Sequence, residues 1–312
     1  MSYRAIIFYL VAAILLGGIY LYEIRQDKKK AEVQEAAKSL LKMPSDSLER
    51  IVIKRETGTI TLQKKVAPHD KNWEITAPIY STTDNAAVLS LINKLADLKY
   101  TRIIAENSGD LAQFGLVHPV LIITYKTATA SGKLTFGSES PIEYSFYATK
   151  DGLEKVYLIS VSDKKILDKD LFELRDKRLF TLEPEKVKRF IIEREATKWV
   201  ILSKKGRWVF EDDDDFRIDQ KKVNSLVTSI SLAHALSFEK QAAIDLDTFG
   251  LKSPKARITI SDGEKREQIV LGSISKENDT RLYAMMEGRP QPVLVGRWLL
   301  DSLPQNREAI KD

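Results

Sequence analysis

The chain has 312 residues, a length that suggests about two domains of ordinary size. Hydrophobic residues make up 43% and charged residues 30% of the chain, which is typical of a protein that folds around a core. The net charge is only +5, and basic residues alternate with acidic ones, so no nucleic-acid partner is expected. Cysteine is absent, which excludes disulfides, thiolate metal sites, a cysteine nucleophile and a lipidated N-terminal cysteine.

An uncharged, apolar run near the N-terminus, Ala5 to Tyr22, predicts a membrane anchor. At about 1.5 Å per residue, a helix of this length measures about 27 Å, close to the roughly 30 Å of a hydrocarbon core. A cleaved signal peptide is the alternative, but its apolar part is usually shorter and is followed by a small-residue cleavage site, which this run lacks. We therefore expect an uncleaved, single-pass transmembrane helix within residues 1–22.

The charges around the run do not settle its orientation. Arg4 precedes it, whereas Arg25 and Lys28 to Lys30 follow, and this excess by itself favours a cytoplasmic C-terminus. Long domains that follow an anchor, however, cross the membrane largely regardless of charge. Both orientations are therefore compatible with the sequence around the anchor.

The segment behind the anchor predicts a helical stalk. Residues Asp27 to Lys42 combine strong helix formers with charges of both signs, and Pro44 ends the pattern. We therefore expect a stalk at residues 23–43, followed by two globular parts at residues 44–181 and 182–312.

An internal repeat defines the architecture of these two parts. Residues Trp73 to Ser140 align with Trp208 to Ser275 at a constant offset of 135 and without a gap. Upstream, Leu48 to Glu56 resembles Val187 to Glu195 at an offset of 139, so the first repeat carries four extra residues in its opening hairpin. An ungapped match of this length indicates a duplication.

Both repeats predict the same order of elements. Two alternating strands form a hairpin, a third strand carries Trp73 or Trp208, and an amphipathic helix then begins at an N-capping Asp84 or Asp219. Three or four further strands and a last helix follow, the latter at Ser162 to Lys177 in the first repeat. This order predicts an α+β fold in which each repeat is a mostly antiparallel sheet with two packed helices.

A short FGLxxP motif follows the first helix of each repeat. Asp110 can cap one helical turn, and Gly115 then takes the position where φ must be positive. In such a turn Leu116 packs on Leu111, and Pro119 starts the next strand. The residues of this structural motif are Leu111, Phe114, Gly115, Leu116 and Pro119 in the first repeat and Leu246, Phe249, Gly250, Leu251 and Pro254 in the second.

These motifs, with an LxxG turn at Leu134 to Gly137 and a closing LRDKRL at Leu174 to Leu179, resemble the bacterial family called domain of unknown function 4340. The resemblance covers nearly all of the chain after the anchor. In that family the domain often recurs in tandem behind an N-terminal membrane segment, and its genes tend to lie beside those of an ABC transporter of the gliding-motility type. The second repeat ends in PQNREAIKD, Pro304 to Asp312, which puts the role of the closing motif there in question.

The resemblance implies an accessory protein at the bacterial inner membrane. Its domains would lie in the periplasm, and its partners would be the membrane itself and a permease, ATPase or auxiliary subunit of such a transporter. The family has no assigned mechanism, so the resemblance supplies no catalytic residues.

The sequence gives little sign of catalytic or metal chemistry. His69, His118 and His234 lie far apart and at different positions of the repeats, so neither a zinc site nor a catalytic triad is expected. The acidic run Glu211 to Asp215 lacks the glycine of a calcium loop and is interpreted as a solvated loop.

Two further features have structural interpretations. Gly137 to Ser140 and Gly272 to Ser275 do not have the G-x-S-x-G spacing of a nucleophile elbow and predict strand turns. Trp73 and Trp208 fit a core better than a ligand-stacking site. We therefore expect no enzyme, no cofactor and no metal.

Three functions remain open from the sequence. The first is a scaffold or accessory subunit of an ABC-type transport system. The second is an envelope module that binds a glycan, a lipid or a peptide in a groove between the repeats. The third is a hydrolase, which would need a nucleophile–base pair that the sequence does not offer.

The anchor can be tested directly. If Ala5 to Tyr22 is retained, N-terminal sequencing of protein extracted from membranes should start at or near Met1. A soluble product that starts near residue 30 would show instead that the segment is a cleaved signal.

Overall fold

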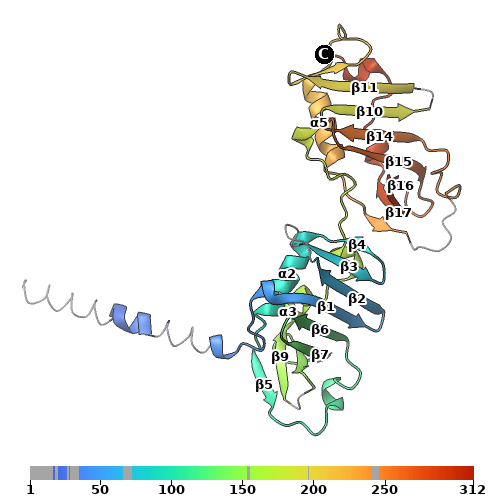
Figure 1. Cartoon of the computed structure of the whole chain (residues 1–312). Helices are drawn as coiled ribbons and strands as arrows, with labels where there is room; N and C mark the ends of the chain where they lie inside the picture. The colour runs from blue at the N-terminus through green and yellow to red at the C-terminus, as the bar shows by residue number, and fades with distance from the viewer. Residues whose placement is uncertain are drawn as a thin grey trace, which may run out of the picture. The chain divides into compact units, whose positions relative to one another are not determined.

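The computed structural model describes residues 17, 20–26, 28, 35–65, 72–152, 155–195, 197–239 and 246–312. The chain forms two compact units, Met1–Asp176 and Lys177–Asp312, each with its own sheet (Figure 1). Most of the predicted anchor lies outside the described residues. Among the residues that are described, no helix is long and apolar enough to span a membrane.

The first unit contains an antiparallel sheet in the order β4-β3-β2-β1-β6-β7-β8-β9-β5. Its strands are β1 (Leu48–Arg55), β2 (Gly58–Lys64), β3 (Trp73–Ala77), β4 (Ser81–Thr82), β5 (Arg102–Ala105), β6 (Leu121–Thr127), β7 (Ser131–Glu139), β8 (Ser145–Lys150) and β9 (Val156–Ser160). Its helices are η1 (Ser45–Ser47), α2 (Asn85–Ala96), η2 (Ala112–Phe114), α3 (Val161–Leu167) and α4 (Leu171–Leu174).

The second unit has an antiparallel sheet with the matching order β12-β11-β10-β14-β15-β16-β17-β13. Its strands are β10 (Arg189–Arg194), β11 (Thr197–Lys204), β12 (Arg207–Phe210), β13 (Ser237–Phe238), β14 (Ala256–Ser261), β15 (Arg266–Ile274), β16 (Arg281–Met286) and β17 (Arg289–Gly296). Its helices are η3 (Pro184–Lys186), α5 (Gln220–Ser231), α6 (Trp298–Asp301) and η4 (Arg307–Ile310). The chain is therefore a tandem α+β protein with two antiparallel sheets.

The long helix of each unit begins where the sequence supplies an acceptor for its free N–H groups. The carboxylate of Asp84 accepts from the Ala87 N–H at 3.0 Å, and that of Asp219 accepts from two N–H groups of α5. Because apolar residues recur every three or four positions, one face of each helix enters the core. Trp73 and Trp208 are both buried in these cores.

The first repeat begins earlier than the sequence suggested. Leu40 and Leu41 are only 6% and 2% exposed and belong to the first core, although the sequence pattern places them in the stalk. Their N–H groups both donate to the Leu98 carbonyl, and the Tyr100 N–H donates to the carbonyl of Lys38. The predicted stalk is therefore too long, because its last residues form an edge segment whose partner is remote in sequence.

The second repeat opens in the same way, inside the segment that the sequence pattern places in the first. The Leu179 N–H donates to Ala233, and the Ala235 N–H donates to Lys177. Leu179 and Phe180 are buried in the second core. The LRDKRL motif is thus divided between the units, and the boundary lies between Asp176 and Lys177 rather than after residue 181.

The predicted last helix of the first repeat, Ser162 to Lys177, is in fact two short helices. Asp168 ends α3, and Asp170 begins α4 with a capping box in which Asp170 and Glu173 satisfy each other's backbone N–H groups. The end of α3 at Asp168 and the start of α4 at Asp170, two residues later, therefore interrupt the predicted helix.

Both repeats close with the same backbone pairing. In the first, the Asp84 N–H donates to the Leu174 carbonyl at 2.9 Å. In the second, the Asp219 N–H donates to the Ile310 carbonyl at 2.9 Å, and the Asp312 N–H donates to Arg217 at 3.0 Å. The second repeat therefore does have a closing element, in the sequence IKD, because backbone hydrogen bonds do not require the LRDKRL side chains.

The start of the first repeat can be tested by truncating one buried side chain. Leu41→Ala should lower the free energy of unfolding by about 3 kcal/mol, because it leaves a cavity in the core. The neighbouring exposed residue supplies the control, since Lys42→Ala should change it by less than about 0.5 kcal/mol. Chemical denaturation measures both. Equal, small effects would mean that this segment is a stalk after all.

Candidate functional site

The residues repeated in both units build a tight turn. After η2, Gly115 has φ +68°, and the Leu116 N–H donates back to the Leu111 carbonyl at 3.1 Å. In the second repeat Gly250 has φ +65°, with the equivalent hydrogen bond from Leu251 to Leu246 at 2.8 Å. This is the glycine-terminated helix end that the motif predicts.

The turn lies directly against the strand that carries the GSxS sequence. A Cβ on Gly115 would lie 2.7 Å from the Ser138 nitrogen, and a Cβ on Gly137 would lie 2.1 Å from the Phe114 carbonyl oxygen. The second repeat gives 2.8 Å at Gly250 and 2.2 Å at Gly272. The recurring glycines are therefore required by a close backbone contact, which is a structural use of the GSxS sequence.

The remaining motif residues pack around this contact. Phe114 and Leu116 are buried with Val156, with Leu111 partly buried against them. The rings of Phe114 and Tyr147 lie 4.9 Å apart between centroids, and those of Phe249 and Tyr283 lie 4.5 Å apart. Pro119 and Pro254 each stand two residues before the strands β6 and β14.

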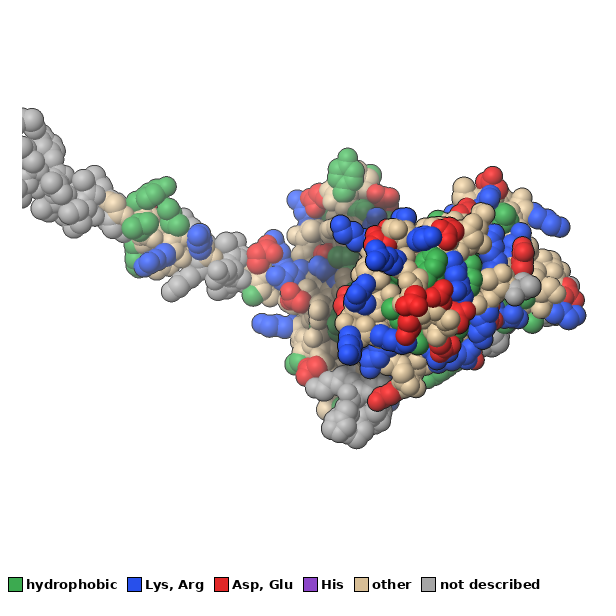
Figure 2. Space-filling model, turned by 90° about the horizontal axis from the view of Figure 1, so that it is seen from above, with side chains coloured by type: hydrophobic (Ala, Val, Ile, Leu, Met, Phe, Trp, Pro, Cys, Tyr) green, Lys and Arg blue, Asp and Glu red, His purple; other side chains and the backbone are tan. Residues whose placement is uncertain are grey.

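The polar features singled out in the sequence do not converge. His118 and His234 are exposed, and His69 lies outside the described residues. Within the described part of the chain, no group of three or more His, Asp or Glu side chains could hold a metal ion. Basic and acidic side chains are interspersed on the face drawn in Figure 2.

Three cations of the same repeat form ion pairs with the acidic loop Glu211 to Asp215. Arg189 pairs with Glu211, Lys204 pairs with Asp214, and Arg307 pairs with Asp212. The hydrogen bond from Arg307 holds the pKa of the Asp212 carboxyl below its usual value. The loop is thus a surface ion-pair network.

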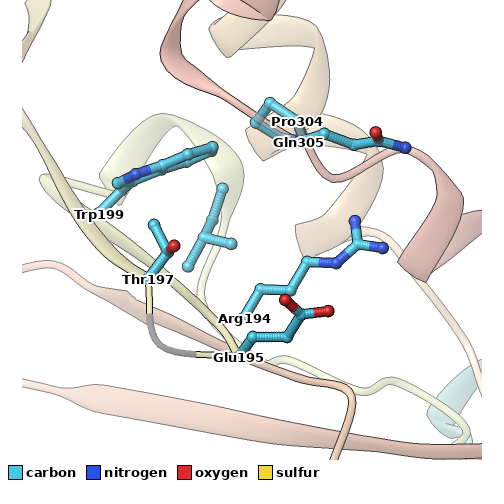
Figure 3. A pocket seen from close by; sticks show the side chains of 7 residues that line it. Arg194, Glu195, Thr197, Trp199, Pro304 and Gln305 are labelled. Atoms are coloured by element: carbon cyan, nitrogen blue, oxygen red, sulfur yellow. The ribbon is translucent and has the colours of Figure 1, made fainter.

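Sequence reasoning missed an arginine pocket in the second repeat. The pocket has a volume of about 230 Å³ and is bounded by the β10–β11 hairpin and the segment after α6. Figure 3 shows Arg194 extending from the hairpin towards the segment of Pro304 and Gln305, with Trp199 on another wall. The lining residues are Ile192, Arg194, Glu195, Thr197, Trp199, Pro304 and Gln305.

In the first repeat the equivalent arginine is already paired within the chain. There Arg55, the counterpart of Arg194, donates from Nε to the Asp168 carboxylate and from Nη2 to the Lys169 carbonyl at 2.6 Å. The counterpart of Asp168 is Pro304, so the acid is missing from the second repeat. Aligning the repeats would have exposed this difference, but only the fold shows that the two positions meet.

A larger groove, of about 810 Å³, lies in the second repeat between α5 and the chain after β17. Trp298 lines it and is 45% exposed. Its indole covers Gly296, where a Cβ would lie 2.5 Å from Cδ1. In the first repeat an ion pair between Lys94 and Asp163 joins α2 and α3 at this place, whereas the counterparts are Ser229 and Leu299.

The fold and these features define a tandem-repeat protein with two copies of one α+β unit. The chain belongs to the family described as Domain of unknown function (DUF4340), whose model matches residues 73–209 and 208–312. Each match starts at the tryptophan strand, β3 or β12, so its limits differ from those of the compact units. No curated protein and no solved structure matches the chain.

The repeated turn can be tested at its glycines. Gly115→Val and Gly250→Val should each lower the free energy of unfolding by more than about 1 kcal/mol, because a β-branched residue is strained at positive φ and would collide with the adjacent strand. Gly109→Val is the control, since its Cβ would meet nothing within 4 Å. Function should fall only as far as the amount of folded protein falls. A variant with unchanged stability and lost function would identify the turn as a binding or catalytic element.

Proposed function

We propose that the chain is a membrane-anchored, extracytoplasmic accessory or scaffold protein of an ABC-type transport system, and not an enzyme. The observation that carries the proposal is that the residues shared by the two repeats are used for folding. They cap helices, end them with glycine, or pack in the cores. A duplicated unit of this kind is suited to binding other proteins.

The membership of the family supports the same proposal. The family model matches both repeats, and the tandem arrangement behind a predicted anchor is the one that the resemblance implies. In this proposal the anchor of residues 1–22 holds the protein at the inner membrane beside a permease. The two repeats present similar folds with different surface side chains outside the membrane.

A second candidate is an envelope module that binds a glycan, a lipid or a peptide. The groove beside α5 favours it, because a half-exposed indole next to polar side chains suits a ligand with both apolar and hydrogen-bonding groups. A hydrolase has the least support. The described histidines, His118 and His234, are exposed and stand where the other repeat has Ser253 and Lys99.

The proposal can be tested by affinity purification of the full-length chain from solubilised membranes. A permease and an ATPase should be recovered in fixed proportion to it. The control is the segment of residues 1–43 fused to an unrelated soluble domain, which should recover neither. Recovery of the chain without any transporter component, under conditions that keep transporters assembled, would contradict the proposal.

A further inference from the structure

We infer that the pocket at Arg194 in the second repeat binds a carboxylate from outside the chain. The first repeat supplies the template, because its equivalent arginine already binds a carboxylate of the chain itself. The inference concerns a ligand site and goes beyond the proposed scaffold function.

In the first repeat, Arg55, Asp168 and Lys164 form a largely buried ion-pair network. Arg55 and Asp168 are 16% and 20% exposed at their side chains, and Lys164 donates to the other oxygen of the same carboxylate. The guanidinium also donates to the Lys169 carbonyl. Arginine suits this position because its planar fork can serve a carboxylate and a second acceptor together.

The second repeat keeps the arginine and loses the acid. Arg194 holds the same place in the hairpin, since Ile192 pairs with Trp199 in the register in which Ile53 pairs with Ile60. The positions of Asp168 and Lys164, however, are taken by Pro304 and Leu300. The two segments are also equivalent in the fold. The Leu174 carbonyl accepts from the Asp84 N–H in the first repeat, and the Ile310 carbonyl accepts from the Asp219 N–H in the second.

Arg194 consequently has a charge without a matching acceptor. It is half-buried, and it makes no hydrogen bond or ion pair with any residue that the structure describes. A partly desolvated cation without a partner is unfavourable, and an anion that enters the pocket would relieve this.

The neighbouring Glu195 does not replace the missing acid. The first repeat has the same dipeptide, with Glu56 after Arg55, and there Glu56 is exposed while the arginine pairs with Asp168. In the second repeat Glu195 lines the pocket together with Arg194, but among the described residues no ion pair or hydrogen bond joins the two side chains.

The other walls of the pocket narrow the ligand class. Trp199, Ile192 and Pro304 offer apolar contacts, whereas Thr197 and Gln305 offer a hydroxyl and an amide. A volume of about 230 Å³ admits one short side chain or a small organic acid. Arg55 contacts both the Asp168 carboxylate and the backbone carbonyl of the next residue, Lys169. An aspartyl residue within a polypeptide reproduces both contacts, whereas a free small carboxylate reproduces only the first.

The experiment measures binding of blocked dipeptides to the full-length chain by ligand-observed NMR at constant ionic strength. The probes are N-acetyl-aspartyl-glycine N-methylamide, which carries the carbonyl of the following residue, its neutral asparaginyl analogue, and acetate. The aspartyl probe should bind in the millimolar range, and the asparaginyl probe at least about tenfold more weakly, since only the former pairs with the guanidinium. If acetate binds as tightly as the aspartyl probe, the site takes small carboxylates. If acetate binds more weakly, the site takes an aspartyl residue of a polypeptide.

Four variants locate the site. Arg194→Gln should abolish binding of the aspartyl probe. Pro304→Asp should also abolish it while leaving the arginine in place, because it restores the internal acid of the first repeat. Arg266→Gln, at an exposed arginine that pairs with Glu287, should leave binding unchanged. Adding Asp168→Ala to the Arg194→Gln chain should restore binding, now at Arg55.

Equal binding of the aspartyl and asparaginyl probes would overturn the inference. Undiminished binding to the Pro304→Asp chain would do the same, and this variant decides the matter if Arg194→Gln fails to fold. Neither result depends on recovery of a transporter, so the inference and the proposed scaffold function can fail separately.

Discussion

Each repeat depends on one close contact between two backbone segments. The glycine-terminated turn at Gly115 approaches the strand at Gly137 so closely that no side chain fits on either glycine, and Gly250 and Gly272 repeat this. The contact fixes where the chain leaves the helical layer and enters the strands that complete the sheet. Because a backbone contact leaves no room for substitution, it also accounts for the recurrence of these glycines in both copies.

The second constraint is the pairing of each repeat's ends with its own interior. The opening segment pairs beside the end of the long helix, as Leu40 does with Leu98, and the closing segment pairs with the residues before that helix, as Ile310 does with Asp219. These backbone bonds tolerate changes of side chain. The two repeats could therefore diverge in sequence at both ends while keeping one topology.

The two repeats share this framework but differ in the charged side chains around α3 and around the equivalent segment of the second repeat. In the first repeat, Asp168 and Asp163 pair with basic side chains and hold the short helix α3 in place. In the second, proline and leucine occupy these positions, and a pocket and a groove lie open. The shared residues thus define the fold, and the residues that are not shared define the surfaces available to partners.

The duplication, the α+β class, the capped helices and the glycine turns can be predicted from the sequence alone, because each rests on a pattern along the chain: a repeat of spacing and residue type, apolar residues at helical or strand intervals, a capping acid, a glycine at positive φ. The same patterns misplace the repeat boundaries and the last helix, and they miss the pocket at Arg194. The boundaries depend on backbone hydrogen bonds between remote segments, such as Leu40 with Leu98, and the break in the last helix depends on local capping. The pocket depends on a contact that, in the first repeat, joins residues 113 positions apart, Arg55 and Asp168. Which of the two arginines meets an acid follows from the fold and not from the sequence pattern, because it depends on where the folded backbone brings side chains that are remote along the chain.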